Sequence, residues 1–284
     1  MYPIDREYNN LTFSFTRIFR PEFKGKSMRV FLCGEEVRDK YFDLRHQVKH
    51  LIENEMGCKA FLGEDIEDFK IESIKKPDHL TIEVNEAKKS DIIIMFLGSP
   101  GTISELTAFC LDKTLNDKLI IFNMEKYRDG KSFIALGPLK LIRPNQLIFY
   151  DINKKDYLCD IIKHLDFLVA LAWYKTSKHL DIVKKEFAPE LFFIYCIVRS
   201  FYPVLYKDIL KSNYGSDHDL RKGLKVLFNK NLIKTDEGKY LIQDNFIENN
   251  IKPGWKINLD RIRLQVMNIR LKETENIANY RLIL

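Results

Sequence analysis

Apolar residues in the first half of the chain gather in five short runs that predict buried β-strands. The runs are "RVFLC" (29–33), "KAFLG" (59–63), "DIIIMFL" (91–97), "KLIIFNM" (118–124) and "QLIFY" (146–150). The last three are apolar on both faces, which is typical of parallel strands that helices cover on each side.

Two stretches between these runs have the spacing of amphipathic helices. The residues on one face of each are Val37, Tyr41, Leu44, Val48 and Leu51, and then Leu80, Val84 and Ala87. Five strands that alternate with helices or longer connections predict an α/β fold built on a doubly wound, five-stranded parallel sheet.

In a doubly wound sheet, ligands bind at the carboxyl ends of the strands, near the point where the strand order reverses. Gly34, Glu64, Asp65 and the stretch 99–105 each follow a predicted strand. We therefore expect them to converge on one crevice. Glu64 and Asp65 would there either contact a ligand or begin a solvated loop, and both interpretations stay open.

The second half of the chain changes to longer helical patterns. After a closing helix, the predicted elements are helices at 189–201, 204–211 and 216–231 and a hairpin at 232–242. Three helices and a hairpin outline a winged helix-turn-helix. The expected domains are residues 1–155 (the sheet), 156–186 (a connecting helix), 187–250 (the winged-helix-like domain) and 251–284 (a helical tail).

Length and composition indicate two soluble domains. The chain has 284 residues, of which 45% are hydrophobic and 30% charged. No apolar run approaches the roughly 20 residues of a membrane span, and the N-terminus lacks the order of a signal peptide. Five scattered cysteines predict neither a disulfide framework nor a metal pair, so Cys33 and Cys110 are interpreted as core residues. We expect a cytoplasmic protein with no metal site and no membrane contact.

The positive charge is concentrated in the second half. Residues 151–284 hold 23 Lys and Arg against 17 Asp and Glu, whereas residues 1–150 hold 23 of each. On the helix predicted at 216–231, the basic side chains opposite the leucine stripe are Arg221, Lys222, Lys225 and Lys230, and the first three are the candidates for nucleic-acid binding. These residues either contact phosphates of a nucleic acid or form a solvated helix face on a domain that docks protein.

Glu105 lies just inside a helix that follows a glycine turn and a fully apolar strand. One interpretation is a capping box, in which Thr102 and Glu105 bond the free amides of the helix start. The other is chemical, because this turn sits at the ligand-binding edge and Gly101 permits close backbone approach. A carboxylate there is suited to face an oxocarbenium ion or to attack an anomeric carbon.

The stretch "SDIIIMFLGSPGTISELTAF" (90–109) resembles the signature of nucleoside 2-deoxyribosyltransferases, in which an aspartate leads a strand and the following turn carries a nucleophilic glutamate. The resemblance is closer to the deoxyribosyltransferase-like effector proteins of bacterial retrons. The similar segments are "FLCG" (31–34), "GED" (63–65), "SPGTISELTAF" (99–109), "KLII" (118–121), "KSFIALGPLKLI" (131–142) and "LDRIRLQVMN" (259–268). The similarity therefore spans nearly the whole chain.

This resemblance implies a deoxyribosyltransferase-like fold with N-glycosidic chemistry, in which Glu105 is the nucleophile. The residues expected to bind substrate are Gly34, Glu64, Asp65, Glu83, Ser99, Gly101 and Thr102. Glu83 takes the place of a substrate-binding acid, with a solvated helix face as the alternative. Ser99 stands where the transferases carry a sugar-binding aspartate, so glycosidic cleavage is expected rather than transfer between bases. Asp91 is interpreted as structural, orienting a strand end.

The resemblance also implies a toxin that cleaves NAD or nucleotides. NAD, as substrate and not as cofactor, is favoured because nicotinamide leaves a cationic pyridinium as a neutral base and needs no general acid. A purine needs an acid to protonate the departing ring, and no histidine lies in the predicted crevice loops. We therefore expect an N-glycosidase effector of phage defence.

The partners that the resemblance implies are a retron reverse transcriptase and its RNA-linked multicopy DNA, which would restrain the toxin. We also expect a homo-oligomer. A late stripe, formed by Leu259, Ile262, Val266 and Ile269, is interpreted as core or oligomer packing. Two alternatives stay open: a nucleotide-binding sensor without turnover, and a nucleic-acid-binding regulator on an inactive enzyme fold.

Overall fold

The computed structural model describes part of the chain in two compact units. The described residues are 16, 28–34, 43–67, 78–176, 181–212, 217–244, 249–250, 256–257, 259–264 and 267–268. Unit 1 comprises Met1–Asn10 and Phe23–Leu165, and unit 2 comprises Leu11–Glu22 and Asp166–Leu284. The border between the units falls inside the helix α9, Tyr157–Thr176, so the domain limits expected from the sequence remain predictions.

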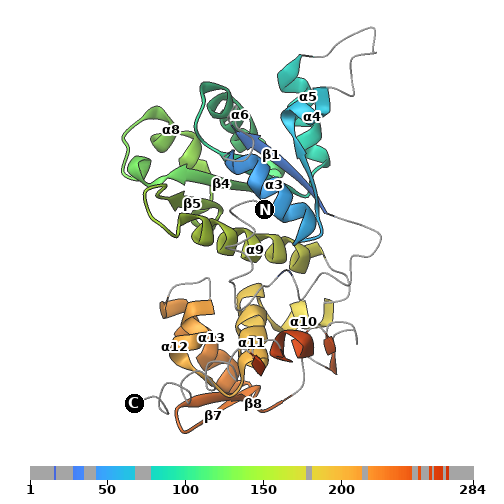
Figure 1. The fold of residues 1–284 in the computed structure, drawn as a ribbon, viewed down its shortest axis with the longest axis vertical. Helices are drawn as coiled ribbons and strands as arrows, with labels where there is room; N and C mark the ends of the chain where they lie inside the picture. The colour runs from blue at the N-terminus through green and yellow to red at the C-terminus, as the bar shows by residue number, and fades with distance from the viewer. Residues whose placement is uncertain are drawn as a thin grey trace, which may run out of the picture. The chain divides into compact units, whose positions relative to one another are not determined.

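Unit 1 is built on a five-stranded parallel sheet, as predicted (Figure 1). The strands are β1 Arg29–Gly34, β2 Lys59–Leu62, β3 Ile92–Phe96, β4 Leu119–Met124 and β5 Leu147–Tyr150. Their order is β2-β1-β3-β4-β5, and every neighbouring pair is parallel. The order reverses between β1 and β3, so the carboxyl ends of these two strands are the place where a doubly wound sheet binds ligands.

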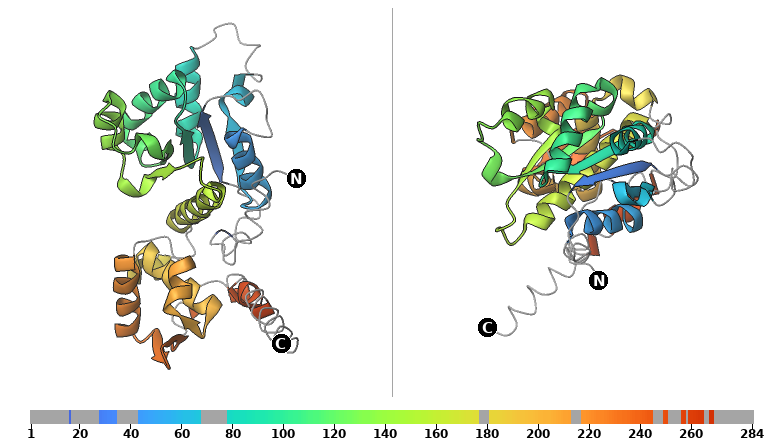
Figure 2. Two further views of the ribbon diagram at one scale, coloured as in Figure 1. Left: turned by 60° about the vertical axis from the view of Figure 1, so that its left-hand side comes forward. Right: turned by 90° about the horizontal axis from the view of Figure 1, so that it is seen from above.

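Helices connect the strands of unit 1 and cover both faces of the sheet. The helices are α3 Leu44–Asn54, α4 Gly63–Glu67, α5 His79–Lys89, α6 Pro100–Leu111, α7 Lys113–Asn116, η2 Glu125–Tyr127, α8 Phe133–Leu136, η3 Pro138–Leu141, η4 Pro144–Gln146 and α9. Figure 2 shows α3 on one face of the sheet and α5 and α6 on the other. The core on the α5 and α6 side is continuous, from Phe31 and Cys33 of β1 through Ile93 of β3 to Leu106 and Phe109 of α6.

Two predicted helices of unit 1 are present with altered limits. The side chain of Asp43 caps α3 by accepting a hydrogen bond from the Arg45 amide, so this helix begins at Leu44. Val37 and Tyr41, which the sequence pattern placed on the same helix, lie outside the described residues. On α5, Leu80 is 49% exposed and does not belong to the buried face.

Unit 2 has the helices and the hairpin that the sequence predicted. Its elements are α10 Asp181–Glu186, α11 Pro189–Phe201, β6 Val204–Leu205, α12 Tyr206–Ser212, α13 Asp217–Asn229, β7 Ile233–Asp236 and β8 Lys239–Ile242. The first two residues of the helix predicted at 204–211 instead form β6, which pairs with β8 in a three-stranded sheet. The winged-helix assignment of these elements remains a prediction.

The hairpin predicted at 232–242 is present, and β7 and β8 are joined by a two-residue turn. Glu237 and Gly238 both have positive φ, 46° and 75°. A two-residue turn of this kind matches the right-handed twist of the strands and favours Gly or a small polar residue. In the core of this unit, Leu220, Leu224 and Leu227 of α13 are buried, as their spacing predicted.

The late stripe is described only in part. Leu259 and Ile262 are buried, in agreement with a packing role, whereas Val266 and Ile269 lie outside the described residues. Within the described part of the chain, no helix has both the length and the apolar character needed to span a membrane.

Candidate active site

The helix that carries Glu105 is capped by a different residue from the one predicted. Ser99 is the N-cap of α6, and its hydroxyl accepts a hydrogen bond from the Thr102 amide at 3.3 Å. Pro100 follows at the first helical position, where a missing N–H costs nothing. Thr102 and Glu105 therefore lie in the first and second turns of the helix, after its N-cap, and the capping-box interpretation of these two residues is wrong. Glu105 is left without a role in starting the helix.

The Glu105 carboxylate points toward the carboxyl end of β1. There the thiol of Cys33 donates a hydrogen bond to it. Burial raises the pKa of Glu105 above its ordinary 4.5; the Cys33 bond and the Arg45 charge oppose this rise, and the Glu64 charge adds to it. Burial and the neighbouring carboxylates Glu105 and Glu83 raise the pKa of Cys33 well above its ordinary value, so this thiol stays protonated as a donor.

A buried arginine stands beside this pair. Arg45, whose side chain is 4% exposed, donates two hydrogen bonds to the Glu64 carboxylate at 3.0 and 3.3 Å. It also lies 3.5 Å from Asp43, which is 2% exposed and accepts a contact from His46 Nδ1 at 2.8 Å. Gly34 makes room for it, since an added Cβ would approach Arg45 Cδ to 2.8 Å. A buried cation is thus fixed at the carboxyl end of β1, the strand that neighbours β3 at the point where the strand order reverses.

Two further acids border this cation. Glu83 of α5 is half-buried, and its Oε1 lies within 3.4 Å of the place a Cβ on Gly63 would take, so it faces the end of β2 rather than open solvent. Asp65 of α4 accepts hydrogen bonds from Lys49 Nζ and from the Leu62 amide, which lower its pKa against the effect of burial. Glu64 and Asp65 therefore belong to a helical turn and not to a solvated loop.

The structure brings together most, but not all, of the residues predicted for the crevice. Gly34, Glu64, Glu83 and Glu105 surround the Cys33 and Arg45 side chains. Gly101 is exposed at the start of α6, with space for backbone approach. By contrast, the Thr102 hydroxyl is buried against the Ser99 hydroxyl, 3.0 Å away.

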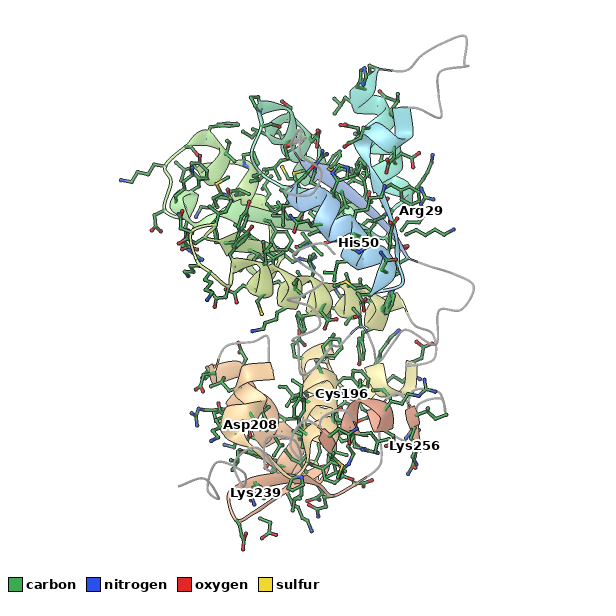
Figure 3. The ribbon with its side chains drawn as sticks, in the orientation of Figure 1. Arg29, His50, Cys196, Asp208, Lys239 and Lys256 are labelled. Atoms are coloured by element: carbon green, nitrogen blue, oxygen red, sulfur yellow. The ribbon has the colours of Figure 1, made fainter. Side chains whose placement is uncertain are left out.

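Asp91 lies at the opposite edge of the sheet. Its carboxylate accepts a hydrogen bond of 2.9 Å from the amide of Arg29, the residue labelled at the start of β1 in Figure 3. It thus orients a strand end, which is the structural role expected for it.

Sequence reasoning missed three members of the site. Arg45 and His46 lie early in a helix whose predicted face was apolar, and Cys33 was interpreted only as a core residue. A signal was present for Arg45: it is a cation two positions after the N-cap residue Asp43, on the helix that connects β1 and β2. No periodicity could show that its stem would pass beside Gly34, because that contact depends on tertiary packing.

The basic helix of unit 2 is divided in its contacts. Arg221 Nε donates to Asp217 Oδ2 at 2.7 Å, and its guanidinium lies 4.5 Å over the Tyr206 ring. Lys222 and Lys225 are exposed, and among the described residues no acid pairs with either. Two of the three predicted nucleic-acid-binding residues therefore offer unneutralised charge.

Comparisons with known proteins agree on one family. The model of the family described as STM3845 retron effector protein matches residues 41–235. An Escherichia coli relative, named as a candidate ribosyltransferase/DNA-binding protein of retron Ec86, is 26% identical over 89% of this chain and 90% of its own. The corresponding Escherichia coli protein of retron Ec73 is 35% identical over 40% of this chain and 37% of its own.

The comparison with solved structures gives a match that carries no information on the fold. The Walker-type ATPase PABY2304 of Pyrococcus abyssi covers 87% of this chain and 94% of its own, with 13% identity and a TM-score of 0.18, too low to indicate a shared fold. The family match, in contrast, covers the carboxyl ends of β2 and β3, α6 with Glu105, and the helices of unit 2. The chain belongs to the STM3845 retron effector protein family.

Proposed function

We propose that this retron effector is an N-glycosidase that cleaves NAD, with Glu105 as the nucleophile. The observation that carries the proposal is the setting of Glu105: a half-buried carboxylate at the reversal point of a parallel sheet, bonded by the Cys33 thiol, near a buried Arg45. A carboxylate with a raised pKa at a ligand-binding edge is typical of a functional group. The curated relatives are named as ribosyltransferase/DNA-binding proteins, which agrees with chemistry at a ribose carbon.

The proposed reaction has two steps. A Glu105 oxygen attacks C1′ of the ribose bound to nicotinamide, the C1′–N bond breaks, and its electron pair neutralises the pyridinium nitrogen. Water then attacks C1′ of the ester, which releases ADP-ribose and a proton and restores the carboxylate. Glu64, Glu83 and the exposed Gly101 backbone bind the ribose and phosphates in this scheme, and the Ser99 hydroxyl stays committed to the helix cap.

NAD suits this site better than a purine nucleotide does. Nicotinamide departs without protonation, whereas adenine needs a positioned acid. One histidine belongs to the described cluster, His46, and its Nδ1 is bonded to the buried Asp43 carboxylate. That imidazole belongs to the Arg45 ion cluster, so it supports the cation and not the leaving group.

Base release by the purified full chain tests the nucleophile. Glu105→Gln should abolish nicotinamide release from NAD, since an amide oxygen is a poor nucleophile, while the melting temperature is retained. Glu190→Gln, an exposed acid of α11 in unit 2, is the matched control and should leave turnover unchanged. Unchanged turnover in Glu105→Gln contradicts the assignment, and NAD binding without any turnover in the wild type indicates a sensor.

Substrate choice is tested in the same assay. NAD should lose nicotinamide faster than dAMP or dATP loses adenine, because the described site offers carboxylates without a free imidazole near the ring. Adenine release at a comparable rate would reverse this order and favour nucleotides as the substrate.

We further propose that unit 2 links the enzyme to its retron. Lys222 and Lys225 of α13 contact the phosphates of the multicopy DNA or its linked RNA. The reverse transcriptase in that complex restrains the enzyme. The enzyme itself acts as a homo-oligomer. The proposal rests on the exposed, unneutralised lysines and on the DNA-binding wording in the names of both relatives.

A further inference from the structure

A cavity lies on the flank of α6 that faces away from Glu105. It encloses about 370 Å³ at the carboxyl ends of β3 and β4, within the range of small-molecule pockets. Ile103 lines the cavity, and Glu105, two residues later, is about 200° further around the helix. The cavity is therefore separate from the carboxylate cluster that surrounds Cys33 and Arg45.

The floor of the cavity carries one unexpected polar residue. Alternate residues of β4 point to the α6 face, and the first two, Leu119 and Ile121, are fully buried in the core. The third, Asn123, continues this row, is 4% exposed and lines the cavity. No described residue is a hydrogen-bond partner of its side-chain amide, and the amide is not one of the solvent-inaccessible polar groups left without a partner. The amide is therefore open to the cavity, where a ligand or water can pair with it.

The walls and rim define the chemistry of a ligand. Leu97, Ile103 and Leu139 form apolar walls, which suit a flat ring. The Asn123 amide presents one donor and one acceptor, the pattern that pairs with the edge of a nucleobase or a carboxamide. At the rim, Lys131 is exposed and has no acid paired with it among the described residues, so it is suited to an anionic group.

We propose that this cavity binds a planar heterocycle with an amide-like edge and an attached phosphate: a mononucleotide whose ring pairs with Asn123 and whose phosphate lies near Lys131. The inference is independent of the proposed catalysis, because it rests on residues of β4, the β3–α6 turn, the outer flank of α6 and the 130–139 segment, and on none of the acids around Glu105. It assigns unit 1 a second small-molecule site.

Titration calorimetry on the full chain tests the site with two probes, dAMP and nicotinamide mononucleotide, each compared with its nucleoside. Asn123→Leu should weaken binding of the preferred probe at least tenfold, since it removes the amide that pairs with the ring. Ile103→Trp should abolish binding by filling the cavity. Lys131→Gln should weaken the nucleotide severalfold and leave its nucleoside unchanged.

Glu105→Gln separates this site from the proposed active site, and it should retain full binding. Loss of binding in Glu105→Gln would place the probe at the carboxylate cluster and overturn the inference. Failure of both probes to bind the wild type would also overturn it, as would equal binding by wild type and Asn123→Leu, because Asn123 then contacts only water. None of these three outcomes decides whether Glu105 catalyses the release of nicotinamide from NAD.

Discussion

At the scale of single residues, the central feature is a protonated thiol held against a carboxylate. Cys33 and Glu105 come from a strand and a helix that are 72 positions apart, and each changes the protonation of the other. The thiol favours the ionised carboxylate by donating to it, and burial disfavours it. The raised pKa of Glu105 is the balance of these effects and the charges of Arg45 and Glu64.

The first prediction concerns the pH dependence of this pair. A nucleophilic Glu105 must be ionised, so kcat/KM for NAD cleavage should fall on the acid side with an inflection above 4.5. Cys33→Ala removes a bond that favours the ionised form and should move the inflection to higher pH. Cys33→Ser keeps a donor and serves as the control. An inflection that is the same in Cys33→Ala and the wild type would show that the thiol does not tune Glu105.

The second prediction concerns the buried cation. Arg45→Met leaves the Asp43 carboxylate buried without its cation and should lower the free energy of unfolding by about 3 kcal/mol. Glu64→Gln removes a partner that is 43% exposed and should cost less than about 1 kcal/mol. Urea denaturation of both variants measures the difference. Equal losses would mean that Asp43 does not depend on Arg45.

At the scale of elements, α6 separates two tasks that the sequence assigned to one motif. Its start depends on Ser99 and Pro100, and its second turn presents Glu105 to β1. The helix thus begins independently of the acid that it positions. A loss of activity in a Glu105 variant can therefore be attributed to the missing carboxylate and not to a defect in helix formation.

The third prediction follows from this separation. Ser99→Ala should lower the free energy of unfolding by about 1 kcal/mol, as the loss of an N-cap does. Glu105→Gln should not lower it at neutral pH. Because the folded pKa of Glu105 is raised, its stabilising contribution is present below 4.5 and is lost as the pH rises through the folded value. Thermal denaturation of both variants at neutral pH checks this. A larger loss of stability in Glu105→Gln than in Ser99→Ala would show that Glu105, and not Ser99, caps the helix.

At the scale of the whole molecule, charge and chemistry are divided between the two units. The carboxylate cluster lies in unit 1, and the exposed lysines of α13 lie in unit 2. The family match, residues 41–235, includes Glu105 and the lysines of α13, so both features lie within the region that defines the family.

The fourth prediction concerns the basic helix. Lys222→Ala with Lys225→Ala should weaken binding of the full chain to a reverse transcriptase–nucleic acid complex and reduce the salt slope by about two units. Arg221→Ala should reduce it by less than about one unit, because Asp217 already neutralises that charge. NAD cleavage by the isolated variants should be unaffected.

Lys113→Ala with Lys140→Ala, an exposed pair in unit 1, is the charge-matched control and should leave the slope unchanged. Binding that keeps its strength and slope in the α13 variant would show that this helix docks protein instead of nucleic acid.

The sequence by itself determined the strands, most helices and the edge of the sheet where the acids lie. Short β-branched runs that are apolar on both faces and end at turn residues favour buried strands, and Gly238 suits the positive φ of the hairpin turn. Tertiary structure decided which groups face each other. The Arg45 stem passing Gly34, the thiol of Cys33 meeting Glu105, and the unpaired amide of Asn123 join residues from different elements, and no local periodicity records such distances.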